Sequence, residues 1–280
     1  MKIFGYRVTG PAFVGMVIVL ANIAIVLFAP LIAPYDQAAF VGDVWAPPSR
    51  HALLGLDNLG RDMFSRMMYG GRMSVSLAFV ICMLAFFIGV TGGFSAAIAG
   101  RWVDLILSRF VDICMSIPTL ILALIILSAL GTSIPVLILT IAGVESTRIF
   151  RIARSVALEV VLLDYVEVAK LRGDPLWKII FREVLPNTLP PLVAEFGIRF
   201  CYTLLFVSSL SFLGLGIQPP MADWGSLVKD NALAINFGGM APIYPAAAVA
   251  ILAIGVNLVV DWYISLGRHR ADTETAPVHG

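Results

Sequence analysis

Long runs of apolar residues constrain this chain more than any other feature of its sequence. The first run, residues 11–33, contains no charged side chain. About 20 apolar residues in a helix are enough to cross the roughly 30 Å of hydrocarbon in a bilayer. Charged residues make up only 13% of the 280 residues, about half of the roughly 25% typical of soluble domains. We therefore expect an all-α integral membrane protein with about six transmembrane helices, near residues 11–33, 74–99, 105–130, 134–154, 189–216 and 241–266.

The spans divide the chain into three parts. Residues 1–73 are expected to hold the N-terminal span and an external segment, and residues 74–267 a core transmembrane domain. That core includes a long cytoplasmic loop at 155–188, and residues 268–280 form a short polar tail. No clear small-x-small cleavage site follows the first apolar run, so we expect this span to be retained.

Lysine and arginine residues are distributed unevenly between the spans. If the N-terminus lies inside, 13 of the 19 fall in cytoplasmic segments and five in external ones. This excess favours cytoplasmic N- and C-termini in a multi-pass protein. The external segment is an exception, with four arginines. Asp57 and Asp62 offset part of its charge, and we expect Arg66 and Arg72 to be able to snorkel to lipid headgroups.

The long cytoplasmic loop carries the strongest local signal. We expect a short helix over residues 164–172, ended by Gly173 in the left-handed conformation. Asp174 can then cap a second helix with Pro175 at its first position, and Pro186 should break that helix before the fifth span. The pattern predicts a compact helix-turn-helix suited to docking in a groove on another protein. A surface loop without a partner remains the alternative.

This loop reads DYVEVAKLRGDPLWKIIFREVLPN from Asp164. It resembles the cytoplasmic EAA coupling loop of ABC importer permeases, whose pattern is E-A-A-x3-G followed by I-x-L-P. The residues that match are Glu167, Ala169, Gly173, Leu185 and Pro186. Val168 replaces the first alanine of the pattern, and Arg172 takes a position that is usually apolar. In that family the loop sits in a cleft of the ATP-binding subunit and transmits its closure to the spans.

Three further segments resemble the dipeptide, oligopeptide and nickel-type permeases of the same family. They are HALLGLDNLGRDMFSRMMYGGRMSVSLA from His51, GRWVDLILSRFVDICMSIPTLILAL from Gly100 and SLSFLGLGIQPPMADWGSLV from Ser209. Leu56 replaces a usual threonine, and Val207 stands where a glutamate is common. The resemblance implies an ABC type I importer permease-like bundle and the C-type subunit of a heterodimeric pair in the bacterial inner membrane.

The partners that this resemblance implies are a second homologous permease subunit, two ATP-binding subunits and an extracytoplasmic substrate-binding protein. ATP and Mg²⁺ would be bound by those ATP-binding subunits, because the sequence contains no Walker loop. We expect no cofactor, metal, catalytic group or nucleic-acid partner in this chain. The substrate would be a small peptide of two to several residues, while nickel chelates, glutathione and opine-like conjugates remain open.

Charged residues inside the predicted spans are candidates for a translocation path. Glu195 and Arg199 lie four residues apart on one helix face and can pair, and Glu145 is a second possible partner. An unpaired arginine at mid-membrane costs a few kcal/mol. Arg199 should therefore face protein or a water-filled path. It could meet substrate carboxylates there, or form a buried pair that fixes helix packing.

Two other functional classes compete with this interpretation. An ion-coupled secondary transporter would need a coupling-ion site near the midplane, for which the same charged residues are the candidates. A membrane-embedded enzyme would need a catalytic grouping of His, Asp, Glu or Ser side chains, which the sequence lacks. Neither class needs the helix-turn-helix loop.

Overall fold

The computed structural model describes residues 2–3, 6–7 and 9–274. Almost all of its regular structure is helical, which confirms the all-α prediction. Strands β1 and β2 form a single short antiparallel pair near the N-terminus. In chain order the elements are β1 Lys2–Ile3, β2 Tyr6–Arg7, α1 Gly10–Ile32, α2 Met63–Ile98, α3 Arg101–Ser116, α4 Thr119–Leu130, α5 Ile134–Val161, α6 Asp164–Leu171, α7 Leu176–Lys178, the π-helix η1 Ile179–Val184, α8 Leu185–Phe212, α9 Trp224–Asp230, the 3-10 helix η2 Ala232–Phe237 and α10 Ile243–Glu274.

Four helical stretches within the described residues are long and apolar enough to cross a membrane. They are α1, α2, the continuous stretch Leu176–Phe212 and the first 24 residues of α10. A fifth crossing is possible if α3 and α4 act together as one bent span. Helix α5 has 28 residues, about 42 Å at 1.5 Å per residue. Its apolar part is interrupted by Glu145, Arg148 and Arg151, so length and composition support four or five of the six expected spans.

The predicted span over residues 105–130 is not one continuous helix. Helices α3 and α4 meet at an angle of 88° instead of continuing in one direction. Ile117 ends α3 in an extended conformation, with φ −92° and ψ 131°. The next residue is Pro118, and a proline disfavours the helical conformation in the residue before it.

Two other predicted boundaries also move. Helix α2 begins at Met63 instead of near residue 74, so the division after residue 73 falls inside this helix. The Asp62 side chain caps it by accepting hydrogen bonds from the backbone N–H of Ser65, at 2.7 Å, and from its hydroxyl, at 2.6 Å. At the other end of the chain, α10 extends to Glu274 and includes the first part of the predicted tail. Residues 275–280 of that tail lie outside the described residues.

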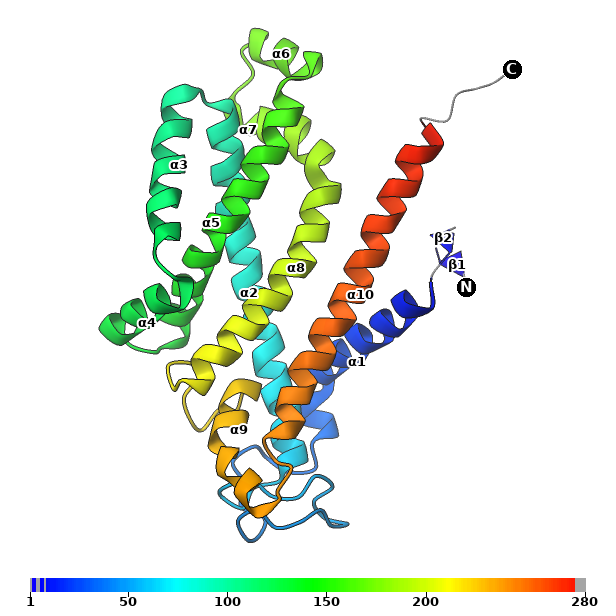
Figure 1. The fold of residues 1–280 in the computed structure, drawn as a ribbon, viewed down its shortest axis with the longest axis vertical. Helices are drawn as coiled ribbons and strands as arrows, with labels where there is room; N and C mark the ends of the chain where they lie inside the picture. Colours follow the sequence, from blue (N-terminus) through cyan, green and yellow to red (C-terminus); the bar gives the residue numbers. More distant parts are fainter. Residues whose placement is uncertain (1, 4–5, 8, 275–280) are drawn as a thin grey trace.

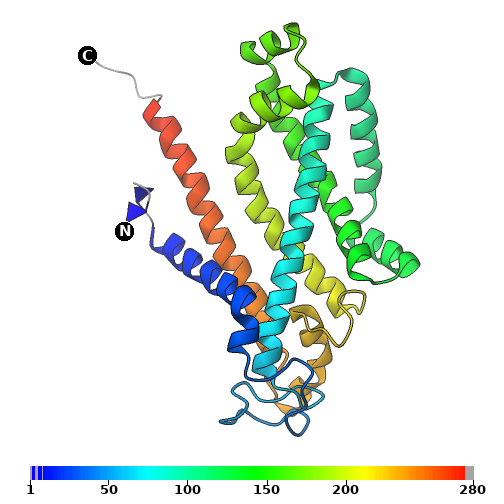
Figure 2. The ribbon, with the colours of Figure 1, turned by 180° about the vertical axis from the view of Figure 1, so that it is seen from behind.

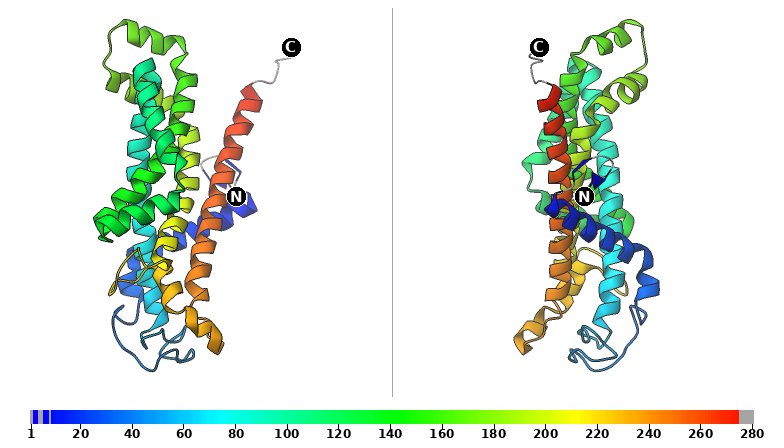
Figure 3. Two further views of the ribbon diagram at one scale, coloured as in Figure 1. Left: turned by 60° about the vertical axis from the view of Figure 1, so that its left-hand side comes forward. Right: turned by 90° about the vertical axis from the view of Figure 1, so that its right-hand side faces the viewer.

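Helices α2 and α5 pack side by side along much of their length (Figures 1 and 2). Glycines make this approach possible. A Cβ atom added at Gly89 would lie 2.7 Å from the Cβ atom of Ile149, and one added at Gly93 would lie 2.7 Å from the carbonyl oxygen of Phe150. Small residues of this kind let the backbones of membrane helices come close. Helix α1 crosses α10 on the other side of the bundle (Figure 3).

The two ends of the bundle carry different structures (Figure 1). One end holds α6 and α7, with the C-terminal end of α10 on the same side. The opposite end holds the cap, which we define as residues 33–62 together with α9 and η2. Asn231 ties the parts of the cap together, because its side-chain oxygen accepts hydrogen bonds from Trp45 Nε1 at 3.3 Å and from the Asn58 backbone at 2.9 Å.

A buried ion-pair group holds the cap to the start of α2. The Asp57 carboxylate is fully buried and receives Arg61 Nε at 2.8 Å and Arg66 Nη1 at 2.6 Å. Arg66 is itself only 2% exposed, so the expectation that it snorkels to lipid headgroups is wrong. Two of the four arginines that oppose the positive-inside rule therefore pair with a carboxylate within the protein, which offsets one of their two charges.

We expect the substitution Asp57→Ala to destabilise the cap by about 3–5 kcal/mol, because it leaves two buried guanidinium groups without their shared carboxylate. Thermal unfolding of the purified protein in detergent should show a lower midpoint, and protease should cut within residues 33–62 more readily. The matched control is Asp43→Ala, at an exposed position of the same segment. Equal midpoints for the two variants would contradict this account of Asp57.

Candidate functional site

The predicted helix-turn-helix loop is present as a compact projection at one end of the bundle. We call residues 162–184 the docking knob. Helix α6 is followed by Gly173, whose φ of +73° confirms the predicted left-handed conformation. Asp174 does not cap the next helix as expected, since Pro175 is the N-cap residue of α7. The Asp174 carboxylate instead receives Lys178 Nζ at 2.6 Å, and this hydrogen bond lowers the pKa of the Asp174 side chain.

The expected break at Pro186 does not occur. The chain is helical without interruption from Leu176 to Phe212. A proline has no N–H group, and its ring clashes with the carbonyl four residues earlier in a regular α-helix. Here the π-helix η1 widens the turn just before Pro186, and the Leu185 N–H bonds to the carbonyl of Ile180, five residues back. The docking knob is therefore joined directly to the long helix α8.

The inner face of the docking knob is an apolar core. Val166 and Ala169 of α6 are fully buried and belong to one cluster with Ile179, Ile180 and Val184. The same cluster contains side chains from α5 and α2, namely Phe94, Ala153, Ala157 and Val160. This packing fixes the docking knob to both helices, so a force on it reaches the bundle.

The docking knob also carries several large apolar side chains that are exposed, together with charged ones. Leu162 and Leu171 are 85% and 81% exposed, and Trp177 is 66% exposed. Val168 and Phe181 are exposed by about half. Large apolar side chains exposed on a projecting segment favour a protein interaction site.

The five residues that match the EAA pattern do not form one surface. Glu167 and Pro186 are exposed, and Leu185 is partly buried. Ala169 lies in the core and Gly173 forms the turn between the helices. The pattern therefore combines residues that shape the docking knob with residues that it presents.

A second candidate site lies within the bundle, where α5 and α8 meet. Arg199 donates a hydrogen bond from Nε to the Glu195 carboxylate, and its Nη1 lies 3.8 Å from Glu145. Arg148 Nη1 lies 3.5 Å from the same Glu145 side chain. Glu145, Glu195 and Arg199 are only 3%, 13% and 15% exposed. The guanidinium of Arg199 also lies 5.5 Å from the ring centre of Tyr202, within the range of a cation–π contact.

The structure thus brings together all three residues predicted for the path, and it adds Arg148. Two arginines and two glutamates cancel in charge, which lowers the cost of placing them among apolar helices. Arg148 was not among the residues predicted for the path, although it falls within the predicted span 134–154. It lies near the middle of α5, three residues after Glu145, and this i, i+3 spacing is the signal that could have identified it.

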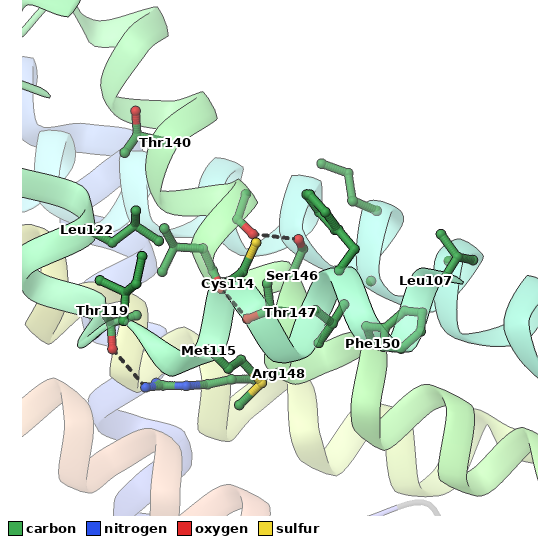
Figure 4. A pocket seen from close by; sticks show the side chains of 18 of the residues that line it. Leu107, Cys114, Met115, Thr119, Leu122, Thr140, Ser146, Thr147, Arg148 and Phe150 are labelled. Atoms are coloured by element: carbon green, nitrogen blue, oxygen red, sulfur yellow. Dashed lines mark hydrogen bonds between the residues drawn. The ribbon is translucent and has the colours of Figure 1, made fainter. Parts of the chain in front are cut away.

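Arg148 also borders a cavity. Its Nη2 donates a 2.9 Å hydrogen bond to Thr119 at the start of α4 (Figure 4). The cavity has a volume of about 510 Å³ and lies between α2, α3, α4 and α5. Its wall is mainly apolar, with Phe110 and Leu122 among the residues that line it.

We predict that Arg199→Leu lowers the stability of the bundle by about 3 kcal/mol, because it leaves a net negative charge in a largely buried site. The yield of folded protein from detergent-solubilised membranes should fall. The double variant Glu195→Gln with Arg199→Leu restores neutrality and should recover much of the loss. A well-folded Arg199→Leu protein with normal yield would contradict this structural role.

A family model and several known proteins match this chain along most of its length. Residues 88–270 match the family model described as "Binding-protein-dependent transport system inner membrane component". The dipeptide transport system permease protein DppC of Alkalihalophilus pseudofirmus is 32% identical over 252 residues, which cover 89% of this chain and 83% of that protein.

Two further relatives carry other substrate names. The di/tripeptide transport system permease protein DppC of Pseudomonas aeruginosa is 31% identical over 258 residues, 88% of this chain and 84% of that protein. The glutathione transport system permease protein GsiD of Pectobacterium atrosepticum is 31% identical over 245 residues, 87% of this chain and 81% of that protein. The chain therefore belongs to the binding-protein-dependent transport family, as a membrane-spanning permease subunit of an ABC-type importer.

Proposed function

We propose that this subunit forms half of a translocation pathway for small peptides. Its partners are a second, homologous permease subunit, two ATP-binding subunits that hold ATP and Mg²⁺, and an extracytoplasmic substrate-binding protein. This chain is the C-type member of the permease pair, in a bacterial inner membrane. The substrate class is supported by the relatives, whose names include dipeptides, di/tripeptides and the peptide glutathione.

One observation carries the proposal, namely the large apolar side chains exposed on the docking knob. Leu162, Leu171 and Trp177 expose most of their surface although the inner face of the same element is closely packed. A rigid apolar projection is suited to a groove on a partner protein. We infer that the partner is the ATP-binding subunit, with Glu167 and Pro186 presented on the surface and Ala169, Gly173 and Leu185 shaping the docking knob.

The arrangement of the two ends supports a cytoplasmic C-terminus. The docking knob and the C-terminal end of α10 lie on the same side of the bundle, while the cap lies opposite (Figure 1). The ATP-binding subunits are in the cytoplasm in this proposal, and the cap then faces the substrate-binding protein. The pairing of Arg61 and Arg66 with Asp57 offsets one of their two positive charges and so removes part of the objection to an external cap.

Glu195 and Arg199 act mainly as a structural pair in this proposal. Each is close to the other within α8, and no substrate is needed to neutralise them. Glu145 links this pair to α5. The group therefore borders the translocation path and holds its wall in place.

Reconstitution into liposomes tests the proposed function. The chain alone should not hydrolyse ATP. The complete importer should hydrolyse ATP and accumulate a labelled dipeptide when the binding protein supplies it. Labelled glutathione and a nickel chelate, offered in parallel, identify the substrate class. Uptake that needs an ion gradient and continues without ATP would support an ion-coupled transporter instead.

A substitution at Gly173 tests the docking role. A Cβ atom at this position would meet nothing within 4 Å, so any effect must come from the backbone conformation. We expect Gly173→Val to disfavour the left-handed turn by about 1–2 kcal/mol and to reduce both co-purification of the ATP-binding subunits and uptake. The control Gly173→Asn tolerates the left-handed region and should retain most of both. Normal assembly and uptake by the valine variant would count against docking through this element.

A further inference from the structure

The cavity between α2, α3, α4 and α5 is separate from the docking knob and has the dimensions of a small-molecule site. Its volume of about 510 Å³ falls within the roughly 300–1,000 Å³ typical of ligand pockets. Most of the wall is apolar, and it includes Phe110, Leu122 and Leu139. Hydroxyl groups and one charged side chain, that of Arg148, complete it.

Arg148 has unused capacity to bind an anion. A guanidinium group carries five N–H donors. Among the residues that the structure describes, Arg148 donates one hydrogen bond, to Thr119, and approaches Glu145 at 3.5 Å without a hydrogen bond. Its side chain is 36% exposed, compared with 15% for Arg199, which is enclosed by Glu195 and Tyr202.

The position of Arg148 suits a carboxylate. Glu145 is shared between two arginines, and the shorter contact of Arg199 is with Glu195, so neither carboxylate is committed to Arg148 alone. The hydrogen bond to Thr119 holds the guanidinium extended beside the cavity (Figure 4). A planar guanidinium with free donors pairs with a carboxylate through two parallel hydrogen bonds, and this pairing is strongest where water is excluded.

We propose that Arg148 binds the carboxylate of the transported substrate in this cavity, while the apolar wall accommodates the body of the molecule. The inference rests on the proposed import of small peptides, whose free C-terminus supplies the carboxylate. Arg148 is then a specificity-determining residue of the path, and Glu145, Glu195 and Arg199 form the support behind it.

Cys114 provides a direct measurement of the occupancy of this cavity. It lines the cavity and is partly exposed, whereas Cys82 and Cys201 are buried. The complete importer in liposomes is treated with a water-soluble maleimide, and Cys114→Ser serves as the labelling control. A saturating dipeptide-loaded binding protein should slow the modification of Cys114. The same dipeptide with a C-terminal amide should protect less at a concentration that saturates the binding protein. That concentration is set from the measured affinity of the binding protein for the amide.

In the variant Arg148→Gln, the concentration of dipeptide-loaded binding protein that half-protects Cys114 should rise by about tenfold or more, as expected for the loss of hydrogen bonds to a charged group. It should also remove the difference between the acid and the amide. Arg151→Gln is the matched control, because Arg151 lies on the same helix but pairs with Asp112 and does not line this cavity. If Arg148→Gln does not assemble, Arg148→Lys keeps the charge without the paired donors and should still weaken protection.

Several outcomes would overturn the inference while leaving peptide import intact. They are an unreactive Cys114, equal protection by the acid and the amide in the wild type, or wild-type protection in Arg148→Gln or Arg148→Lys. Protection of Cys114 that changes with the lipid composition of the liposomes and not with the peptide would overturn the inference as well. An importer that takes up no dipeptide would instead contradict the proposed function, which the uptake assay measures independently.

Discussion

The pairing of charges inside an apolar bundle is the constraint on which much of this structure depends. A guanidinium or carboxylate without a partner costs several kcal/mol in a low-dielectric surrounding. Asp57 gives Arg61 and Arg66 a shared partner at the cap, and Glu145 bridges Arg148 of α5 and Arg199 of α8 inside the bundle. The first group joins the cap to the start of α2 and the second joins α5 to α8, so they set the geometry of the bundle as well as its charge.

Helix α5 connects the parts of the molecule that matter for transport. Glu145 and Arg148 lie near its middle, Arg148 lines the cavity, and its end continues into the docking knob. Further along α5, Arg151 pairs with Asp112 of α3 at 2.6 Å, and Arg154 pairs with Asp104, which also lies in α3. The docking knob also continues directly into α8 through the π-helix. A displacement of the docking knob would therefore reach the charged group through both helices and reach α3 through ion pairs.

The bent pair of α3 and α4 explains how a mainly apolar chain can enclose a cavity. If residues 105–130 formed one straight helix, they would pack along the neighbouring helices as a conventional span. The turn at Ile117 and Pro118 directs α4 away from α3, and the space between them is closed by α5. Thr119, the first residue of α4, then lies within hydrogen-bond distance of Arg148. The local backbone restriction imposed by one proline thus determines the surroundings of the charged group.

The sequence alone determined the membrane class, the helical content, the left-handed turn at Gly173 and the pairing of Glu195 with Arg199. Each of these depends on composition or on residues a few positions apart, where helix geometry fixes the distance. Several other features depended on tertiary contacts: the continuous helix through Pro186, the burial of Arg66 and the place of Arg148 beside a cavity. Whether an arginine reaches lipid headgroups, a buried aspartate or a cavity depends on which helices surround it. No local pattern contains that information, because the neighbours are brought together only when the whole bundle packs.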